Sequence, residues 1–230
     1  APVAGESARA LGRGVTDLRI GVPEAEWRAA APDVAAAGRE ALRALERDGA
    51  ALVPLELPLA AHAAAIGYMT IAIEALAGLR EVRSLHGHEL GLDLQLFLTA
   101  VSDFAPDDYV DAQRLRESLR DQLAGALRDV DVIALPTTAN VAPPVTDAEA
   151  RSSFIDPPAL DAACRFSFLG NLTGLPAATA PVGASGALPI GLQIVGDAWD
   201  EACVLQVVAA LERSGVASVR KPPGAIDLLA

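Results

Sequence analysis

The chain has 230 residues, a net charge of −12 at pH 7, 52% apolar residues and 21% charged residues. This hydrophobicity excludes global intrinsic disorder. The acidic balance argues against a protein that coats DNA or RNA, because phosphate binding needs a basic face. Only two cysteines occur, Cys164 and Cys203, so a disulfide framework is excluded.

The apolar segments are too short or too interrupted to predict a membrane span. The longest candidate, 59–79, is interrupted by His62, Gly67, Glu74 and Gly78, whereas a span needs about 18 apolar residues. Charged residues occupy 1–19, where the apolar part of a signal peptide would lie. We therefore expect a cytoplasmic protein without a membrane partner.

The first half of the chain predicts two strands and two helices. A short alternating strand is predicted over 18–23, and an amphipathic helix over 33–47. A second strand over 51–57 contains Pro54, which places it at a sheet edge. An alanine-rich helical stretch is predicted over 60–85, with a break at Gly87 and Gly91.

The middle of the chain predicts two helices and an inner strand. A short helix begins at Leu92, and a longer one begins at Pro106 and continues to Leu127. The β-branched run 130–135 then predicts a strand in the interior of a sheet. The loop 136–158 contains five prolines, and its length makes it a candidate pocket wall.

The last third predicts an irregular segment, a hairpin and a helix. Residues 166–176 are apolar, with Gly170 and Gly174 as backbone breaks. Strands over 177–182 and 188–195 are joined by a predicted tight turn over 183–186, and a helix follows over 200–213. The alternation of strands and helices predicts an α/β fold. We expect one domain over 1–230, with 1–16 as an N-terminal segment and 215–230 as a surface tail.

No complete catalytic site can be assembled from these residues. The Gly-x-Ser-x-Gly motif of α/β hydrolases is absent. His86, His88 and Glu89 could chelate a metal, but a catalytic zinc site usually needs a third protein ligand with suitable spacing, and the only other histidine is His62. The only lysine is Lys221. We therefore predict no metal and no cofactor.

A two-part motif resembles the C-terminal part of the amidase signature enzymes. Residues 165–177 read RFSFLGNLTGLPA, and after Pro181 residues 188–196 read LPIGLQIVG. The strand over 18–23 and the segment 109–137 also resemble that family, so the match covers about residues 17–214. The resemblance implies a mixed β-sheet core flanked by helices.

The resemblance also implies a reaction and the position of its catalytic groups. Family enzymes hydrolyse a carboxamide through an acyl-enzyme on serine, and a lysine acts as base through a bridging serine. The family's nucleophile segment and its lysine precede the matched region, and Lys221 lies in a terminal Lys-Pro-Pro stretch. We therefore expect the C-terminal half of an amidase, with no catalytic residue in this chain.

Four residues are predicted to form part of the substrate pocket. Thr137 and Thr138 follow a predicted strand, where α/β sites gather. Phe168 and Asn171 lie in the irregular segment. For Phe168 the alternative is core packing, and for Asn171 it is capping of a turn.

The expected partners are a small-molecule amide and either the missing N-terminal half or another copy of the chain. A divided sheet leaves a bare edge, which favours a homo-oligomer. One alternative function is a catalytically silent binding or scaffold protein. A second is the amidase-type component of a tRNA-dependent amidotransferase, which the acidic charge and the absence of arginine from 91–95 disfavour. A third is a metal hydrolase centred on His86 and His88.

Overall fold

The computed structural model describes residues 5–147 and 156–219. Its five-stranded sheet has the order β2-β1-β3-β5-β4. β1 pairs in parallel with β2 and β3, whereas β5 is antiparallel to β3 and β4, which confirms the predicted mixed α/β fold. The strands are β1 (Arg19–Pro23), β2 (Ala51–Leu55), β3 (Val132–Pro136), β4 (Ala177–Ser185) and β5 (Leu188–Gly196).

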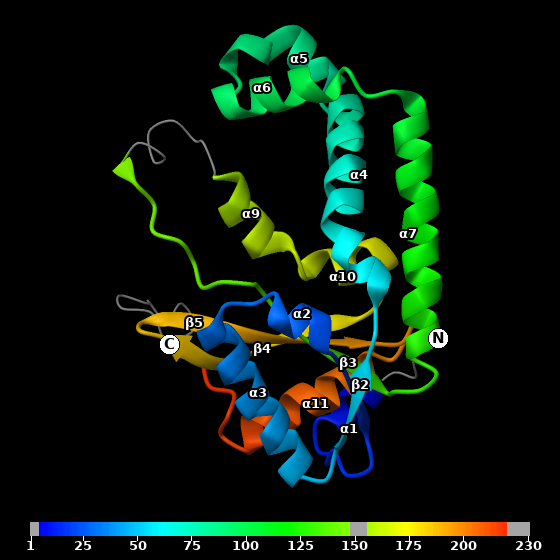
Figure 1. Cartoon of the computed structure of the whole chain (residues 1–230), viewed down its shortest axis with the longest axis vertical. Coiled ribbons are helices and arrows are strands. Elements are labelled where there is room, and N and C mark those ends of the chain that lie inside the picture. The colour runs from blue at the N-terminus through cyan, green and yellow to red at the C-terminus, as the bar shows by residue number, and fades with distance from the viewer. Residues whose placement is uncertain (1–4, 148–155, 220–230) are drawn as a thin grey trace.

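Helices cover both faces of this sheet (Figure 1). α3 and α11 pack against one face, and α4, α7 and α10 pack against the other. The helices are α1 (Glu6–Ala10), α2 (Glu24–Arg28), α3 (Pro32–Arg47), η1 (Pro58–His62), α4 (Ala63–Gly78), α5 (Arg80–His86), η2 (Gly87–Glu89), α6 (Leu92–Val101), α7 (Pro106–Ala126), α9 (Pro157–Cys164), α10 (Ser167–Thr173) and α11 (Glu201–Arg213).

Two predictions about strand position are confirmed. β2 lies at the edge of the sheet, where Pro54 removes no hydrogen bond from an inner ladder. β3 is the central strand, and all five of its residues are buried. Its side chains alternate between the two cores, because successive residues of a strand point to opposite faces.

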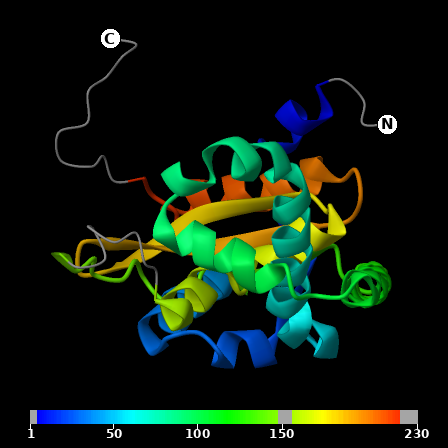
Figure 2. The same ribbon diagram turned by 90° about the horizontal axis from the view of Figure 1, so that it is seen from above.

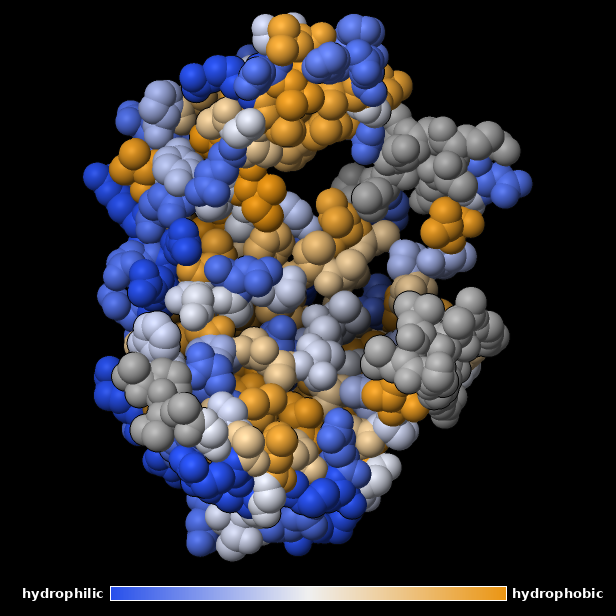
Figure 3. Space-filling model, turned by 180° about the vertical axis from the view of Figure 1, so that it is seen from behind, coloured by the Kyte–Doolittle hydropathy of each residue, from blue (hydrophilic) through white to orange (hydrophobic). Residues whose placement is uncertain are grey.

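Helices α4 to α7 form an arm over residues 63–126. α4 and α7 run away from the sheet, and α5 and α6 form the tip of the arm (Figure 1). Figure 2 shows α7 end-on, so that it crosses the direction of β4 and β5. Large exposed apolar residues gather at this tip (Figure 3): Leu85, Leu92, Leu96 and Phe97.

The helical stretch predicted over 60–85 is confirmed, and it is divided into three elements. The segment begins as the 3₁₀ helix η1, continues as α4, ends at Gly78 and restarts as α5 at Arg80. Glycine is a poor helix former, and the turn beside Gly78 allows α6 to pack back against α4.

The irregular segment predicted over 166–176 is mostly a helix. α10 occupies Ser167–Thr173, and Gly174 ends it with φ of 70°. The amide of Gly174 donates to the carbonyl of Gly170 at 2.9 Å. Gly174 is therefore a helix C-cap that uses a conformation favourable only to glycine, and the sequence analysis did not recognise the short helix before it.

The predicted hairpin is present, but its turn is displaced. β4 continues past a bulge between Pro181 and Gly183 and ends at Ser185, so the turn is Gly186-Ala187. Gly186 has φ of 59°, which suits a two-residue hairpin turn. After α11 the chain is not wholly at the surface, because Ala217 is buried and Ser218 donates to the carbonyl of Pro181 at 3.1 Å.

The sequence analysis expected no segment long and apolar enough to span a membrane, but the segment 58–78 meets that criterion. By length and composition it could cross a membrane, and 33% of its apolar window is buried. A core helix meets the same criterion, and α4 packs against α6, α7 and α10. Within the described residues this single segment is weak evidence for a membrane span.

Gly38 should be required for the packing of Trp27. A Cβ atom at Gly38 would lie 2.3 Å from the Trp27 ring, whose Nε1 donates to the carbonyl of Ala134 at 3.1 Å. We expect Gly38→Ala to lower the free energy of unfolding by about 1–2 kcal/mol, because overpacking outweighs the better helix propensity of alanine. Chemical denaturation followed by circular dichroism measures this.

The matched control is Gly125→Ala in α7, where the nearest atom to the added Cβ is an Arg128 side-chain nitrogen at 3.5 Å. This variant should be as stable as the original chain or up to about 1 kcal/mol more stable. A Gly38→Ala protein that matches the control would contradict the packing argument.

Candidate functional site

The threonines after β3 lie at the carboxyl end of the parallel strands, as predicted. The Thr137 amide donates to the carbonyl of Gly191 at 3.0 Å, and its hydroxyl donates to the Thr179 hydroxyl at 3.3 Å. The Thr138 hydroxyl donates to the carbonyl of Asn140 at 2.7 Å. Both threonines are half-buried. A hydroxyl oxygen has two lone pairs, so the Thr137 oxygen can accept a hydrogen bond from an external N–H group while it is bonded to Thr179.

The small residue opposite Thr137 is a steric requirement. A Cβ atom at Gly191 would lie 2.6 Å from the Thr137 hydroxyl oxygen and 2.9 Å from a Thr179 methyl carbon. Real contacts are almost never so short, so any other residue at 191 would displace the threonines. Gly191, in the LPIGLQIVG segment, therefore allows the Thr137 and Thr179 hydroxyls to pair at the carboxyl end of β3.

Phe168 is a packed residue of α10 and is only 5% exposed. Its ring contacts the Tyr68 ring edge-on, with centroids 4.9 Å apart. A Cβ atom at Gly67 would lie 2.1 Å from the Phe168 ring, so α4 approaches this side chain closely. Phe168 is therefore part of the hydrophobic core. Its contact with a substrate stays a prediction.

Asn171 lies inside α10 and is exposed, so its interpretation as a turn-capping residue is wrong. The structure does not gather the four predicted pocket residues into one cluster. Thr137 and Thr138 lie at the carboxyl end of the central strand β3, whereas Phe168 belongs to the core under α4. The contact of Asn171 with a substrate stays a prediction.

Gln193 connects these two regions, and the sequence analysis did not assign it a role. It is 6% exposed, and its Nε2 donates to the carbonyl of Phe166 at 3.2 Å. On β5 it stands opposite Thr179 of β4 and Leu135 of β3. A polar residue inside the apolar pattern of a strand was the signal that could have identified it.

Tyr68 borders the same region and was also missed. Its hydroxyl donates to the carbonyl of Leu160 at 3.3 Å, which links α4 to α9. Burial and the adjacent Cys164 thiol raise the pKa of Tyr68 to about 12. The phenol therefore keeps its proton at neutral pH and serves as a hydrogen-bond donor rather than a base.

An ion pair between a buried glutamate and a half-buried arginine lies near the carboxyl ends of β1 and β3. Glu26 is 3% exposed, and its Oε2 is 3.7 Å from Nε of Arg165. Burial raises the pKa of Glu26, and the charge of Arg165 opposes that shift. The Arg165 Nε is buried without a hydrogen-bond partner among the described residues. No sequence pattern indicated this pair, because its members lie far apart in the chain.

Two described hydroxyls contact carboxylates: Ser185 hydrogen-bonds to Asp33, and the Tyr109 hydroxyl donates to Oε1 of Glu74 at 2.9 Å. The hydroxyls of Ser102, Ser118, Ser167 and Ser214 donate to nearby backbone carbonyls. Lys221 lies outside the described residues. Over the same ranges, no group of three or more histidine, cysteine or acidic side chains could hold a metal ion. His86 instead contacts Glu89, with Nδ1 and Oε1 2.9 Å apart.

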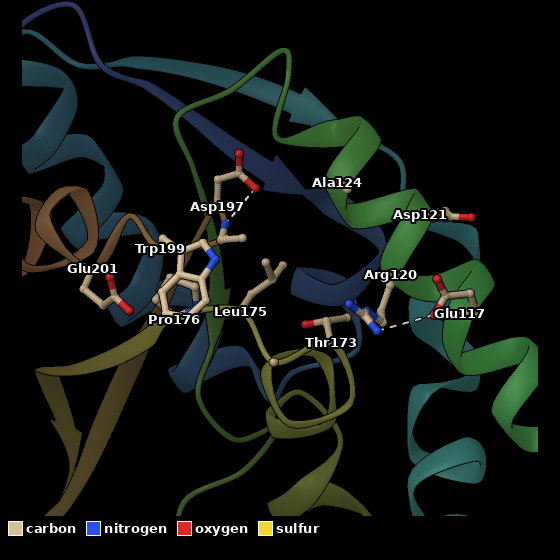
Figure 4. A pocket seen from close by; sticks show the side chains of 12 residues that line it. Glu117, Arg120, Asp121, Ala124, Thr173, Leu175, Pro176, Asp197, Trp199 and Glu201 are labelled. Atoms are coloured by element: carbon tan, nitrogen blue, oxygen red, sulfur yellow. Dashed lines mark hydrogen bonds and ion pairs between the residues drawn. The ribbon is translucent and has the colours of Figure 1, made fainter. Parts of the chain in front are cut away.

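A separate hollow of about 370 Å³ lies between α7, the α10–β4 connection and the β5–α11 loop (Figure 4). Trp199 stands beside it, 73% exposed and with φ of 68°. Arg120 on its other side is paired with Glu117 at 3.4 Å. The antiparallel register places this hollow at the end of β3 opposite Thr137, because Gly196 pairs with Val132. It is therefore distinct from the predicted pocket wall.

Comparison with known proteins identifies the family. The family model described as Amidase matches residues 4–205. The A component of a glutamyl-tRNA(Gln) amidotransferase from Myxococcus xanthus is 34% identical over 93% of this chain and 48% of its own length. A fatty acid amide hydrolase from Medicago truncatula is 32% identical over 79% of this chain and 30% of its own length.

A solved structure agrees in fold. A bacterial aryl acylamidase of the amidase signature family superposes with a TM-score of 0.72 and 22% identity, over 90% of this chain and 46% of its own. The chain therefore spans less than half the length of each of these three relatives. The match over residues 4–205 includes all five strands and the site region described above, and it shows that the chain belongs to the amidase family.

Proposed function

We propose that this chain is the C-terminal portion of an amidase and supplies its scaffold and one wall of its substrate pocket. The observation that carries the proposal is the pair of hydroxyls at the carboxyl end of β3, held by Gly191 in a family segment. The hydroxyls of Ser102, Ser118, Ser167 and Ser214 are engaged by backbone carbonyls and the single lysine is Lys221, which supports placing the catalytic serines and lysine in other polypeptide. Amidase relatives about twice as long agree with this division.

The proposed reaction converts a carboxamide and water into a carboxylate and ammonia or an amine. A serine oxygen adds to the amide carbon, its proton passes through the bridging serine and the lysine to the leaving nitrogen, and the C–N bond breaks. Water then cleaves the resulting ester and regenerates the serine. In this scheme the Thr137 oxygen accepts an N–H of the bound amide, and Phe168 and Tyr68 form an apolar wall.

The proposed partner is the N-terminal half of the same enzyme, or a second copy of the chain in a homo-oligomer. Among the described strands β4 pairs only with β5, and Ala177 and Thr179 are exposed on the face of β4 opposite the α3–α11 core. An unpaired edge and an open face are typical surfaces for association. We retain the expectation of a cytoplasmic location and a small-molecule amide substrate.

A second candidate function is that of the amidase-type component in a tRNA-dependent amidotransferase. The observation in its favour is the glutamyl-tRNA(Gln) amidotransferase relative, whose match extends over 93% of this chain. The net charge of −12 favours the small-molecule amidase, because contact with tRNA needs a basic surface.

Amide hydrolysis should require the upstream half. We expect the purified chain alone to release no ammonia from a panel of aliphatic and aryl amides, and its combination with the upstream half to release it. Ammonia release at equal protein concentration is the measurement. Activity of the isolated chain, with contaminating enzyme excluded, would contradict the division of the active site. An inactive combination would favour the silent scaffold.

The Thr137 hydroxyl should contribute to substrate binding. In the combined enzyme, Thr137→Val keeps the side-chain shape but removes the acceptor, and we expect kcat/KM to fall about tenfold. The matched control is Thr16→Val, which precedes β1 at the opposite end of the sheet and loses only a hydroxyl contact to the Asp48 carbonyl. Equal kcat/KM values for the two variants would contradict a contact between Thr137 and the substrate.

A further inference from the structure

The carboxyl end of α10 is held by a side chain from another helix. Arg116 of α7 donates through Nε to the carbonyl of Leu172 at 2.6 Å. Carbonyls in the last turn of a helix have no partner within that helix, and a cation at this end also interacts favourably with the helix dipole. Arg116 therefore satisfies a group that α10 cannot satisfy itself.

The Arg116 guanidinium is itself oriented by a chain of hydrogen bonds. Its Nη1 donates to Oε1 of Gln113 at 3.3 Å, and Nε2 of Gln113 donates to the Thr70 hydroxyl at 3.0 Å. Thr70 is buried and donates to the carbonyl of Ile66 at 2.8 Å. These bonds connect α4, α7 and α10 through side chains that face one another.

The helix α4 is also the surface on which Phe168 packs. The Tyr68 ring and the bare backbone of Gly67 receive the Phe168 ring near the start of α10. The Arg116 bond fixes the other end of the same helix. A helix of seven residues has little stability of its own, so these two attachments determine how α10 lies.

We infer that Arg116 is a positioning residue, which holds α10 and therefore Phe168 in the orientation that the pocket wall requires. Its consequence for catalysis rests on the proposed amidase function. Its effect on α10 does not, because the helix can be followed without any amide being cleaved.

Cys164 provides the reporter in the full 230-residue chain. It is half-buried at the end of α9, packs against the core that contains Phe168, and its carbonyl accepts the Ser167 hydroxyl at 2.8 Å. Burial raises the pKa of the Cys203 thiol to about 12, which makes it a poor competitor for a thiol reagent. Cys203→Ala as a common background leaves Cys164 as the only thiol.

We expect Arg116→Met to increase the rate of Cys164 labelling by an aromatic disulfide reagent about tenfold, with unchanged far-ultraviolet circular dichroism. Arg116→Lys should give an intermediate rate, because lysine restores one donor to Leu172. The matched control is Arg114→Met, since Arg114 is exposed on the same helix and pairs with Asp111 at 2.9 Å. If Arg116→Met does not fold, Gln113→Leu keeps Arg116, removes its lateral support, and should raise the rate by a smaller factor.

In the combined enzyme, Arg116→Met should raise KM for an amide with a large apolar acyl group several-fold more than for acetamide, with a smaller change in kcat. A purely structural role would reduce kcat in proportion to the folded fraction and leave both KM values unchanged, and that result overturns the inference. Labelling rates equal to those of Arg114→Met also overturn it. If the combination is inactive with every amide, the proposed function fails, while the labelling rates still decide whether Arg116 positions α10.

Discussion

The burial of β3 on both faces is the constraint on which the rest of the structure depends. Val132 and Ala134 belong to the core beneath α3 and α11, whereas Ile133 and Leu135 belong to the core beneath α4, α7 and α10. A shift of one residue would exchange the faces of every side chain. Both cores fix the register of β3, so the strand ends at a defined position. Thr137 follows directly, at the carboxyl end of β3, where its hydroxyl pairs with that of Thr179.

Around this strand, side chains donate hydrogen bonds to backbone carbonyls of neighbouring elements. Gln193 donates to Phe166, Arg116 to Leu172, and Trp27 to Ala134. Buried backbone carbonyls need such partners. The Gln193 bond also gives a physical reason for the two-part motif, because it joins the segment before α10 to β5. The motif therefore describes one connected part of the structure rather than two separate signals.

The two ends of the sheet differ in character. Near Thr137 lie small residues and hydroxyls, and β4, which carries Thr179, is an outer strand of the described sheet. At the opposite end, Trp199 and Arg120 border a hollow built wholly from this chain. Membership of the amidase family, together with relatives about twice as long, directs attention to the first of these regions. Exposed apolar residues also gather at the tip of the arm, away from both ends of the sheet.

The sequence by itself determined the α/β class, the inner position of β3, the edge position of β2 and the family, because these follow from local periodicity, proline and a contiguous motif. It also predicted that Thr137 follows a strand. It did not determine that 167–173 is a helix, since a seven-residue helix depends on contacts with α4 and α7 rather than on propensity. The Glu26–Arg165 pair, the Gln193 bond and the Arg116 bond were decided by tertiary structure alone, because each joins residues at least 27 positions apart.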